Sequence, residues 1–136
     1  MIRMFSITNK TRNESPLSGS FFKKIKNKIV GQNYSLSLVF VGDKFSQKLN
    51  LKHRGKNKPA NVLSFSIDKE VGEIFLNIGR AKKEAPKYEL SQKNFIIFLF
   101  IHALLHLKNY EHGTRMSEQE KYWLKKFKTT PTRNTL

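Results

Sequence analysis

The sequence predicts an α+β fold in which a small mixed β-sheet is packed with several helices. Short segments with alternating apolar residues lie near the start and in the middle of the chain, and the longest apolar segment lies late. Alternation is typical of strands, whereas a long unbroken apolar run is typical of a buried helix. The 136 residues suffice for one core. We therefore expect a single domain over residues 1–136, with residues 129–136 as a frayed tail.

The first half of the chain predicts two strands and two helices. Residues 2–8 alternate weakly and are expected to form a strand. Residues 21–30 (FFKKIKNKIV) have apolar side chains at helical spacing and lysines opposite, which predicts a helix on the core. A strand is expected at residues 34–41, and Gly42 and Asp43 then end it and offer a cap for a short helix.

The middle of the chain predicts a hairpin. Residues 62–67 (VLSFSI) and 73–78 (EIFLNI) alternate as strands do, and residues 68–72 (DKEVG) are expected to connect them. The next segment, residues 79–89, predicts a short helix that is interrupted near Pro86.

Two more helices are expected in the last third. A long apolar helix starts at about Ser91, and its run FIIFLFIHALLHL is shorter than the roughly 18 residues that suggest a membrane span. We expect a buried helix and no membrane association. The final helix is predicted to start at Ser117, because Ser117 and Glu120 match the S-x-x-E capping box.

Three histidines form the candidate metal site. His102 and His106 are four positions apart, which places both imidazoles on one face of a helix. His112 would point elsewhere on a continuous helix, so a turn is expected, and Asn109 tolerates the left-handed conformation that such a turn needs. Three neutral imidazoles suit one divalent ion, with Zn²⁺ the expected one, and leave a fourth position open. The alternative is a helix whose histidines make hydrogen bonds within the core.

The spacing H-x3-H-x5-H also occurs in metzincin proteases. In those enzymes a glutamate directly follows the first histidine and acts as general base. This chain has Ala103 at that position. Peptide hydrolysis of that kind is therefore disfavoured, and a metalloprotease stays a third hypothesis.

The chain is strongly basic. Its formal net charge of +16 favours binding to polyanions, with nucleic acid ahead of an anionic membrane surface, although the composition of an AT-rich genome is an alternative cause. Residues 53–61 (HRGKNKPAN) predict a loop in which Arg54 grips a phosphate and Lys56 and Lys58 add unspecific attraction, unless this is only a solvated turn. The absence of cysteine and of a signal-peptide pattern leads us to expect a cytoplasmic location.

Three sequence blocks, LNLKHRGKNKPANVLSF, GEIFLNI and HALLHLKNYEH, resemble in order and spacing the YbeY family of bacterial rRNA maturation factors, which are described as single-strand-specific endoribonucleases. The resemblance implies an α+β fold, a zinc-like ion, action on ribosomal RNA, metal ligands at His102, His106 and His112, and a functionally important arginine at Arg54. The chain departs from the family pattern at five positions. It has Ala60 where the family usually has Thr, Ser66 for Pro, Ala103 for Gly, Asn109 for Gly and Glu111 for Asp.

Together these features predict a metal-dependent endoribonuclease of ribosomal RNA processing. The ion would activate water or polarise a phosphoryl oxygen while Arg54 holds a phosphate. Glu111, by its position, and Glu73 are the candidate helpers, and a structural role for both carboxylates is the alternative. The expected partners are ribosomal RNA, the ribosomal subunit, and ribosomal or assembly proteins. A second hypothesis is a non-catalytic ribosome assembly factor with a structural metal, although structural sites usually have four protein ligands. His53 has no assigned role: it is expected to be a surface histidine beside Arg54, and contact with the substrate is the alternative.

Overall fold

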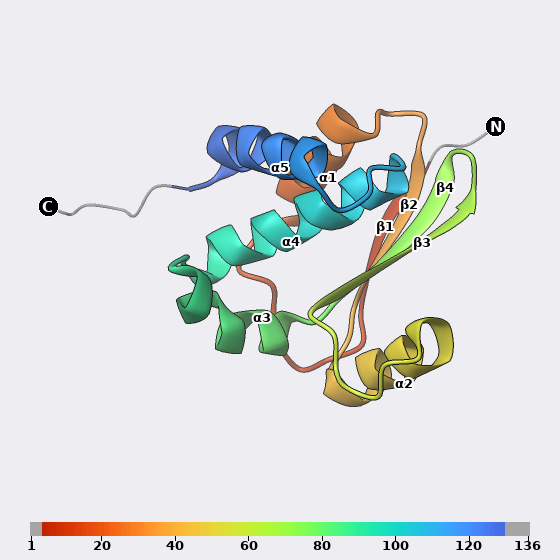
Figure 1. The fold of residues 1–136 in the computed structure, drawn as a ribbon, viewed down its shortest axis with the longest axis vertical. Coiled ribbons are helices and arrows are strands. Elements are labelled where there is room, and N and C mark those ends of the chain that lie inside the picture. Colours follow the sequence, from red (N-terminus) through yellow and green to blue (C-terminus); the bar gives the residue numbers. More distant parts are fainter. Residues whose placement is uncertain (1–3, 130–136) are drawn as a thin grey trace, which may run out of the picture.

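The fold is known from a computed structural model that describes residues 4–129. In this part of the chain, four strands form one mixed sheet with the order β1-β2-β4-β3 (Figure 1). Strand β1 (Phe5–Asn9) is parallel to β2 (Ser35–Phe40), and β2 is parallel to β4 (Val71–Leu76). Strand β3 (Val62–Asp68) is antiparallel to β4 and forms one edge of the sheet. The predicted α+β class and mixed sheet are confirmed.

Helices cover both faces of this sheet. Those of the described residues are α1 (Gly19–Ile29), α2 (Asp43–Arg54), α3 (Ile78–Glu84), the 3-10 helix η1 (Ala85–Tyr88), α4 (Gln92–Leu107) and α5 (Thr114–Phe127). Figure 1 shows α1, α4 and α5 together on one side of the sheet and α2 on the other. The Phe75 ring of β4 stacks on Phe45 of α2 with 5.9 Å between the centroids, which packs α2 against the sheet.

Helix α4 is the centre of the hydrophobic core. Ten of its sixteen residues are buried, between the sheet and the other two helices of that side. A helix that is apolar on all sides is expected in such a place, so the predicted buried helix is confirmed. No single helix among residues 4–129 is long and apolar enough to cross a membrane, and α3–η1 joined to α4 would pass that test only as a pair bent by 105°.

The C-terminal end of α4 lies directly against β4. A Cβ atom at Gly72 would collide with the Tyr34 hydroxyl group and would lie 3.0 Å from Leu107 Cδ2. Leu107 is the last residue of α4, so glycine at this point of β4 lets the histidine-bearing end of the helix approach the sheet. Gly72 was predicted to be part of the hairpin turn. That prediction is wrong, because β4 already begins at Val71 and only two residues form the turn.

Several other predicted boundaries are wrong by a few residues. Helix α2 continues to Arg54, which was predicted to lie in a loop, and it ends where Gly55 takes the left-handed conformation with φ of 69°. The strand predicted to reach residue 78 ends at Leu76, because the Asn77 side chain accepts a hydrogen bond from Arg80 N and thereby caps α3.

The last helix and the chain ends also differ from the prediction. Helix α5 begins at Thr114, and Ser117 lies inside it rather than at its cap. Thr129 N donates to Asn94 Oδ1 at 2.7 Å, so the predicted fraying does not begin at this residue. The rest of the predicted tail, residues 130–136, and the first residues of the predicted first strand, 2 and 3, lie outside the described residues.

Candidate functional site

The three predicted histidines come together at the end of α4. One potential ligand atom from each of His102, His106 and His112 lies within 4.8 Å of the other two. The chain reverses after the helix because Asn109 has φ of 72°, the left-handed conformation that the sequence predicted for it. Tyr110 N then donates to Leu105 O at 3.0 Å, which brings the following segment back over the helix.

The imidazole of His102 is held by a carboxylate from α5. His102 Nδ1 and Glu120 Oε2 are 2.5 Å apart, and the Glu120 side chain is only 15% exposed. Since a carboxylate accepts, Nδ1 carries the proton and Nε2 keeps its lone pair for a metal. Glu120 was predicted to cap α5, which is wrong, because this carboxylate pairs with His102 across the α4–α5 interface.

His106 is oriented in the same way by the backbone. Its Nδ1 donates to the carbonyl oxygen of Tyr110 at 3.2 Å, so its Nε2 is also left as an acceptor. The pKa of His106 lies below its ordinary value, because burial disfavours the charged form and the imidazoles of His102 and His112 add to this effect. A neutral His106 imidazole is the form that coordinates metals.

The two Nε2 atoms that remain face each other. Nε2 of His102 and Nε2 of His106 are 3.2 Å apart. Bond lengths of about 2.0–2.1 Å at a tetrahedral zinc ion imply about 3.3 Å between two ligand nitrogens, so this spacing fits a shared ion. Two acceptors this close, with both Nδ1 protons already committed, need a cation or a proton between them. The donor set therefore fits a divalent metal.

A cavity of about 430 Å³ opens over these histidines. It lies between α4, the edge strand β3 and the end of α2, and its lining residues are His53, Arg54, Val62, Leu63, Ser64, Phe65, Ser66, His102, Ala103, His106, Leu107 and His112. Of the predicted substrate-binding residues, the structure brings Arg54 into the pocket of the three histidines. A guanidinium group therefore borders the same cavity as the three imidazoles.

Lys56 and Lys58 lie outside this cavity. They line an adjacent one of about 240 Å³, and Arg54 lines both. The loop that carries them is fixed to α2, because Asn50 Nδ2 donates to Lys58 O at 2.9 Å and Gln47 Nε2 donates to Asn57 Oδ1 at 2.8 Å. The loop therefore presents its cations at a defined place beside the metal pocket.

The two predicted helper carboxylates do not line the metal pocket. Glu111 is exposed and borders a separate, open pocket that also includes His112. Glu73 lies in β4 opposite Phe65. Among the described residues, the lining of the metal pocket contains no carboxylate, and Glu120 reaches the site only through His102.

A sequence signal for Glu120 does exist. Met116, Glu120, Trp123 and Phe127 follow one another at helical spacing, and Met116 and Phe127 are buried. A carboxylate on the apolar stripe of a helix needs a partner inside the fold. The capping-box pattern at Ser117 obscured this signal, because the same glutamate satisfies both patterns.

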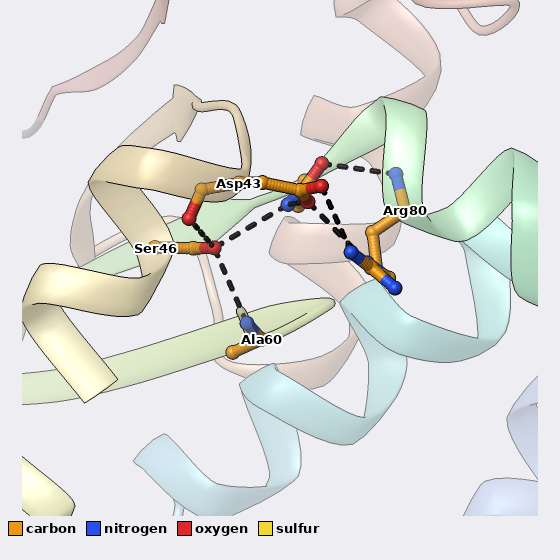
Figure 2. Close-up of polar contacts among 5 residues, drawn as sticks. Asp43, Ser46, Ala60 and Arg80 are labelled. Carbon is orange, nitrogen blue, oxygen red and sulfur yellow. Dashed lines mark hydrogen bonds and ion pairs between the residues drawn. The ribbon is translucent and has the colours of Figure 1, made fainter. Parts of the chain in front are cut away.

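A second polar cluster joins α2, α3 and the segment that precedes β3. We call Asp43, Ser46, Asn77 and Arg80 the aspartate network. Figure 2 shows Ser46 between Asp43 and Ala60, with Arg80 reaching Asp43 from α3. Ser46 Oγ accepts from Ala60 N at 3.2 Å, and Arg80 Nη2 lies 2.8 Å from Asp43 Oδ2. The network ties the start of α2 to the start of α3 and to the segment that enters β3.

Comparisons with known proteins agree on one family. The sequence model of the family described as "Endoribonuclease YbeY" matches residues 6–128. Three similar proteins of that name are from Mycoplasma mycoides (32% identity over 127 residues, 79% of this chain and 77% of the relative), Persephonella marina (32% over 126 residues, 84% and 81%) and Phytoplasma mali (34% over 112 residues, 78% and 76%).

A solved structure supports the fold independently. The solution structure of a protein from Thermotoga maritima superimposes with a TM-score of 0.63 and 21% sequence identity, covering 91% of this chain and 89% of that one. At this identity the likeness concerns the fold alone.

Proposed function

Because this chain belongs to the YbeY family, we propose that it is a metal-dependent endoribonuclease that cleaves single-stranded RNA during ribosomal RNA processing. The observation that carries the proposal is the arrangement of two imidazole Nε2 atoms 3.2 Å apart in a pocket that Arg54 also lines. We propose His102, His106 and His112 as the ligands and Zn²⁺ as the ion.

The proposed chemistry needs one ion and several fixed side chains. A bound divalent ion supplies an activated water or polarises a phosphoryl oxygen. Arg54 holds a phosphate of the substrate through its planar fork of N–H donors. Glu120 keeps Nε2 of His102 unprotonated and directed into the pocket, and the Tyr110 carbonyl does the same for His106. Lys56 and Lys58 attract the neighbouring phosphates.

The site is better suited to catalysis than to a purely structural metal. Among the described residues, the group that can share an ion comprises three histidines, whereas structural zinc usually has four protein ligands. An open fourth position, in a cavity of about 430 Å³, leaves room for water and substrate. The peptidase alternative has no such support, because the residue after His102 is the buried Ala103.

The proposal extends to partners and place. The charge of +16 suits a ribosomal RNA substrate in the setting of the ribosomal subunit. Ribosomal or assembly proteins and a cytoplasmic location belong to the same proposal. Glu111 remains a predicted helper; it borders, together with His112, a pocket outside the one that the three histidines line.

The test combines metal content with RNA cleavage. Protein purified without an affinity tag should contain about one equivalent of a transition metal by elemental mass spectrometry. His106→Ala should lose both the metal and the cleavage of a single-stranded RNA, whereas Lys108→Ala, an exposed neighbour on the same turn, should keep both. Bound metal without chelator-sensitive cleavage would favour the assembly factor with a structural metal instead.

Arg54 provides a separate test of substrate binding. Arg54→Glu should keep the metal, because Arg54 is not among the grouped metal-binding residues. It should lose roughly 10- to 100-fold in RNA cleavage, as expected for a charge-assisted hydrogen bond of about 1.5–3 kcal/mol. Normal ribosomal RNA ends in cells that carry only this variant would contradict the proposal.

A further inference from the structure

We propose that His53, supported by Phe65, forms a stacking site for one unpaired nucleobase beside the metal pocket. The inference rests on the proposed endoribonuclease function and adds a specificity-determining residue to it. It concerns a histidine that the metal site leaves unused, and it supplies a physical reason for acting on single strands.

The position of the His53 ring is the first argument. His53 and Phe65 are in ring contact, with 4.7 Å between the centroids and 52° between the planes, and both line the cavity that holds the three metal-binding histidines. His53 comes from the last turn of α2 and Phe65 from the edge strand β3. The imidazole is thus an exposed ring with an apolar support behind it, at the wall of the pocket.

The second argument is that the His53 imidazole has no other task. Within the part of the chain that the structure describes, no hydrogen bond or ion pair engages its ring nitrogens. Phe65, in contrast, is half-buried and packs on Phe75 behind it, with 5.8 Å between the centroids. Phe65 is held in place by packing, and the exposed His53 imidazole has no polar partner among the described residues, so its ring is available for stacking on a base.

The third argument concerns what can occupy this place. Arg54 is the next residue and lines the same cavity, so a phosphate held by Arg54 would have its own nucleoside within reach of His53. Proteins that bind single-stranded RNA stack bases on aromatic and histidine rings, because an unpaired base exposes its flat face. A base inside a duplex is already stacked and paired, so it cannot enter the pocket without an added cost.

The test uses metal-free protein, so that binding is measured without cleavage. Wild type, His53→Ala, His53→Phe and the control Lys52→Ala are titrated with a short single-stranded RNA and with copies that carry one abasic position at each site in turn. Lys52 is exposed on the same helical turn and does not line the cavity. Each protein is also loaded with Zn²⁺ and its metal content measured, to verify that the site is intact.

We expect His53→Ala to bind the intact RNA about tenfold more weakly, within the range for one stacked base. His53→Phe and Lys52→Ala should stay within about twofold of wild type. The wild type should bind one of the abasic RNAs about tenfold more weakly than the intact RNA. His53→Ala should bind that abasic RNA as well as it binds the intact RNA. If His53→Ala binds every RNA, including each abasic copy, more weakly than wild type by the same factor, His53 contacts the backbone and the proposal is overturned. Unchanged affinity of His53→Ala for the intact RNA would also overturn it.

The outcome separates this inference from the proposed function. A stacking effect of His53 in a protein that, loaded with metal, cuts no RNA would support the base site and contradict the nuclease. Cleavage that depends on metal, together with binding that ignores His53, would keep the nuclease and remove the stacking site.

Discussion

The histidine cluster and the aspartate network are both polar clusters of a small basic protein, yet they are organised in opposite ways. In the network donors are paired with acceptors: Asn77 Nδ2 donates to Asp43 Oδ1 at 2.8 Å, and Arg80 Nη2 donates to Asp43 Oδ2 at the same distance. In the cluster, Nε2 of His102 and Nε2 of His106 are two acceptors 3.2 Å apart.

The difference shows which cluster serves the fold and which serves a ligand. A polar network with matched partners is complete by itself and holds structural elements together. A group of acceptors whose other nitrogens are already fixed by Glu120 and Tyr110 is incomplete without a cation. The following predictions test this division, from the largest expected effect to the smallest.

The largest difference should appear when metal is removed and returned. Zn²⁺ at about 100 times its dissociation constant should stabilise the metal-free wild type by about 2.7 kcal/mol, because the ion binds the folded site. His106→Ala should show no such gain, whereas Asn77→Ala should show all of it. Thermal unfolding with and without a chelator measures both. An equal gain in His106→Ala would show that zinc stabilises the protein elsewhere.

Glu120→Gln should weaken metal binding by roughly 10- to 100-fold, as is usual when a partner of a metal-binding histidine is removed. The amide keeps the size of the side chain but loses the charge that fixes the His102 proton on Nδ1. Competition with a zinc-binding dye measures the affinity. Glu118→Gln, an exposed neighbour on α5, is the matched control and should change nothing. Unchanged zinc affinity in Glu120→Gln would show that the contact of Glu120 with His102 only helps α5 to pack on α4.

Asn77→Ala should lower the free energy of unfolding by about 1–3 kcal/mol, because the side chain is buried and its loss leaves partners in the network unpaired. It should also remove the cap of α3, since Asn77 Oδ1 accepts from Arg80 N. Urea unfolding of the metal-free protein measures the change. Zinc affinity should remain that of the wild type, and a large loss would mean that the two clusters are coupled.

The sequence predicted that the three histidines come together, because the information for this is local. The spacing of four positions from His102 to His106 defines one helix face, and Asn109 supplies the reversal that returns His112. The buried helix and the strands follow equally from periodicity, whereas the pairing of the strands does not. Boundaries were less certain where one residue fits two patterns, as with Gly72, which suits a turn but serves the close approach of α4 to β4.

Residues that act across the fold were missed for a different reason. Glu120 meets His102 over a separation of 18 residues, and no spacing rule connects two helices whose packing is not yet known. The same applies to the aspartate network, where Asp43 and Arg80 are 37 residues apart. The sequence indicated Arg54 through the resemblance, but only the fold shows that Arg54 joins two cavities.

The two clusters should also differ in the pH range that affects stability. The pKa of His106 lies below 6.5 because of burial, followed by the neighbouring imidazoles, so the unfolded chain binds more protons than the folded protein just below neutrality. The metal-free protein should therefore become less stable as the pH falls from about 7 to about 5. Urea midpoints over this range measure how stability depends on pH. This dependence should be weaker in His106→Ala, and an unchanged dependence in this variant would show that another group titrates.

The aspartate network should respond only in acid, and weakly. The hydrogen bond from Arg80 is the main cause that lowers the pKa of Asp43 from 3.8, while partial burial opposes it and Asn77 adds to it. A lowered carboxyl pKa gives stability that is present above the unfolded value and is lost as the pH falls through the folded value. The loss should therefore begin below about pH 4, and it should be small because the Asp43 side chain is 43% exposed and screened by water. In urea unfolding, the free energy of unfolding should fall less between about pH 5 and pH 3 for Asp43→Asn than for the wild type. A larger acid loss in that variant would mean that the carboxylate is not the titrating group of the network.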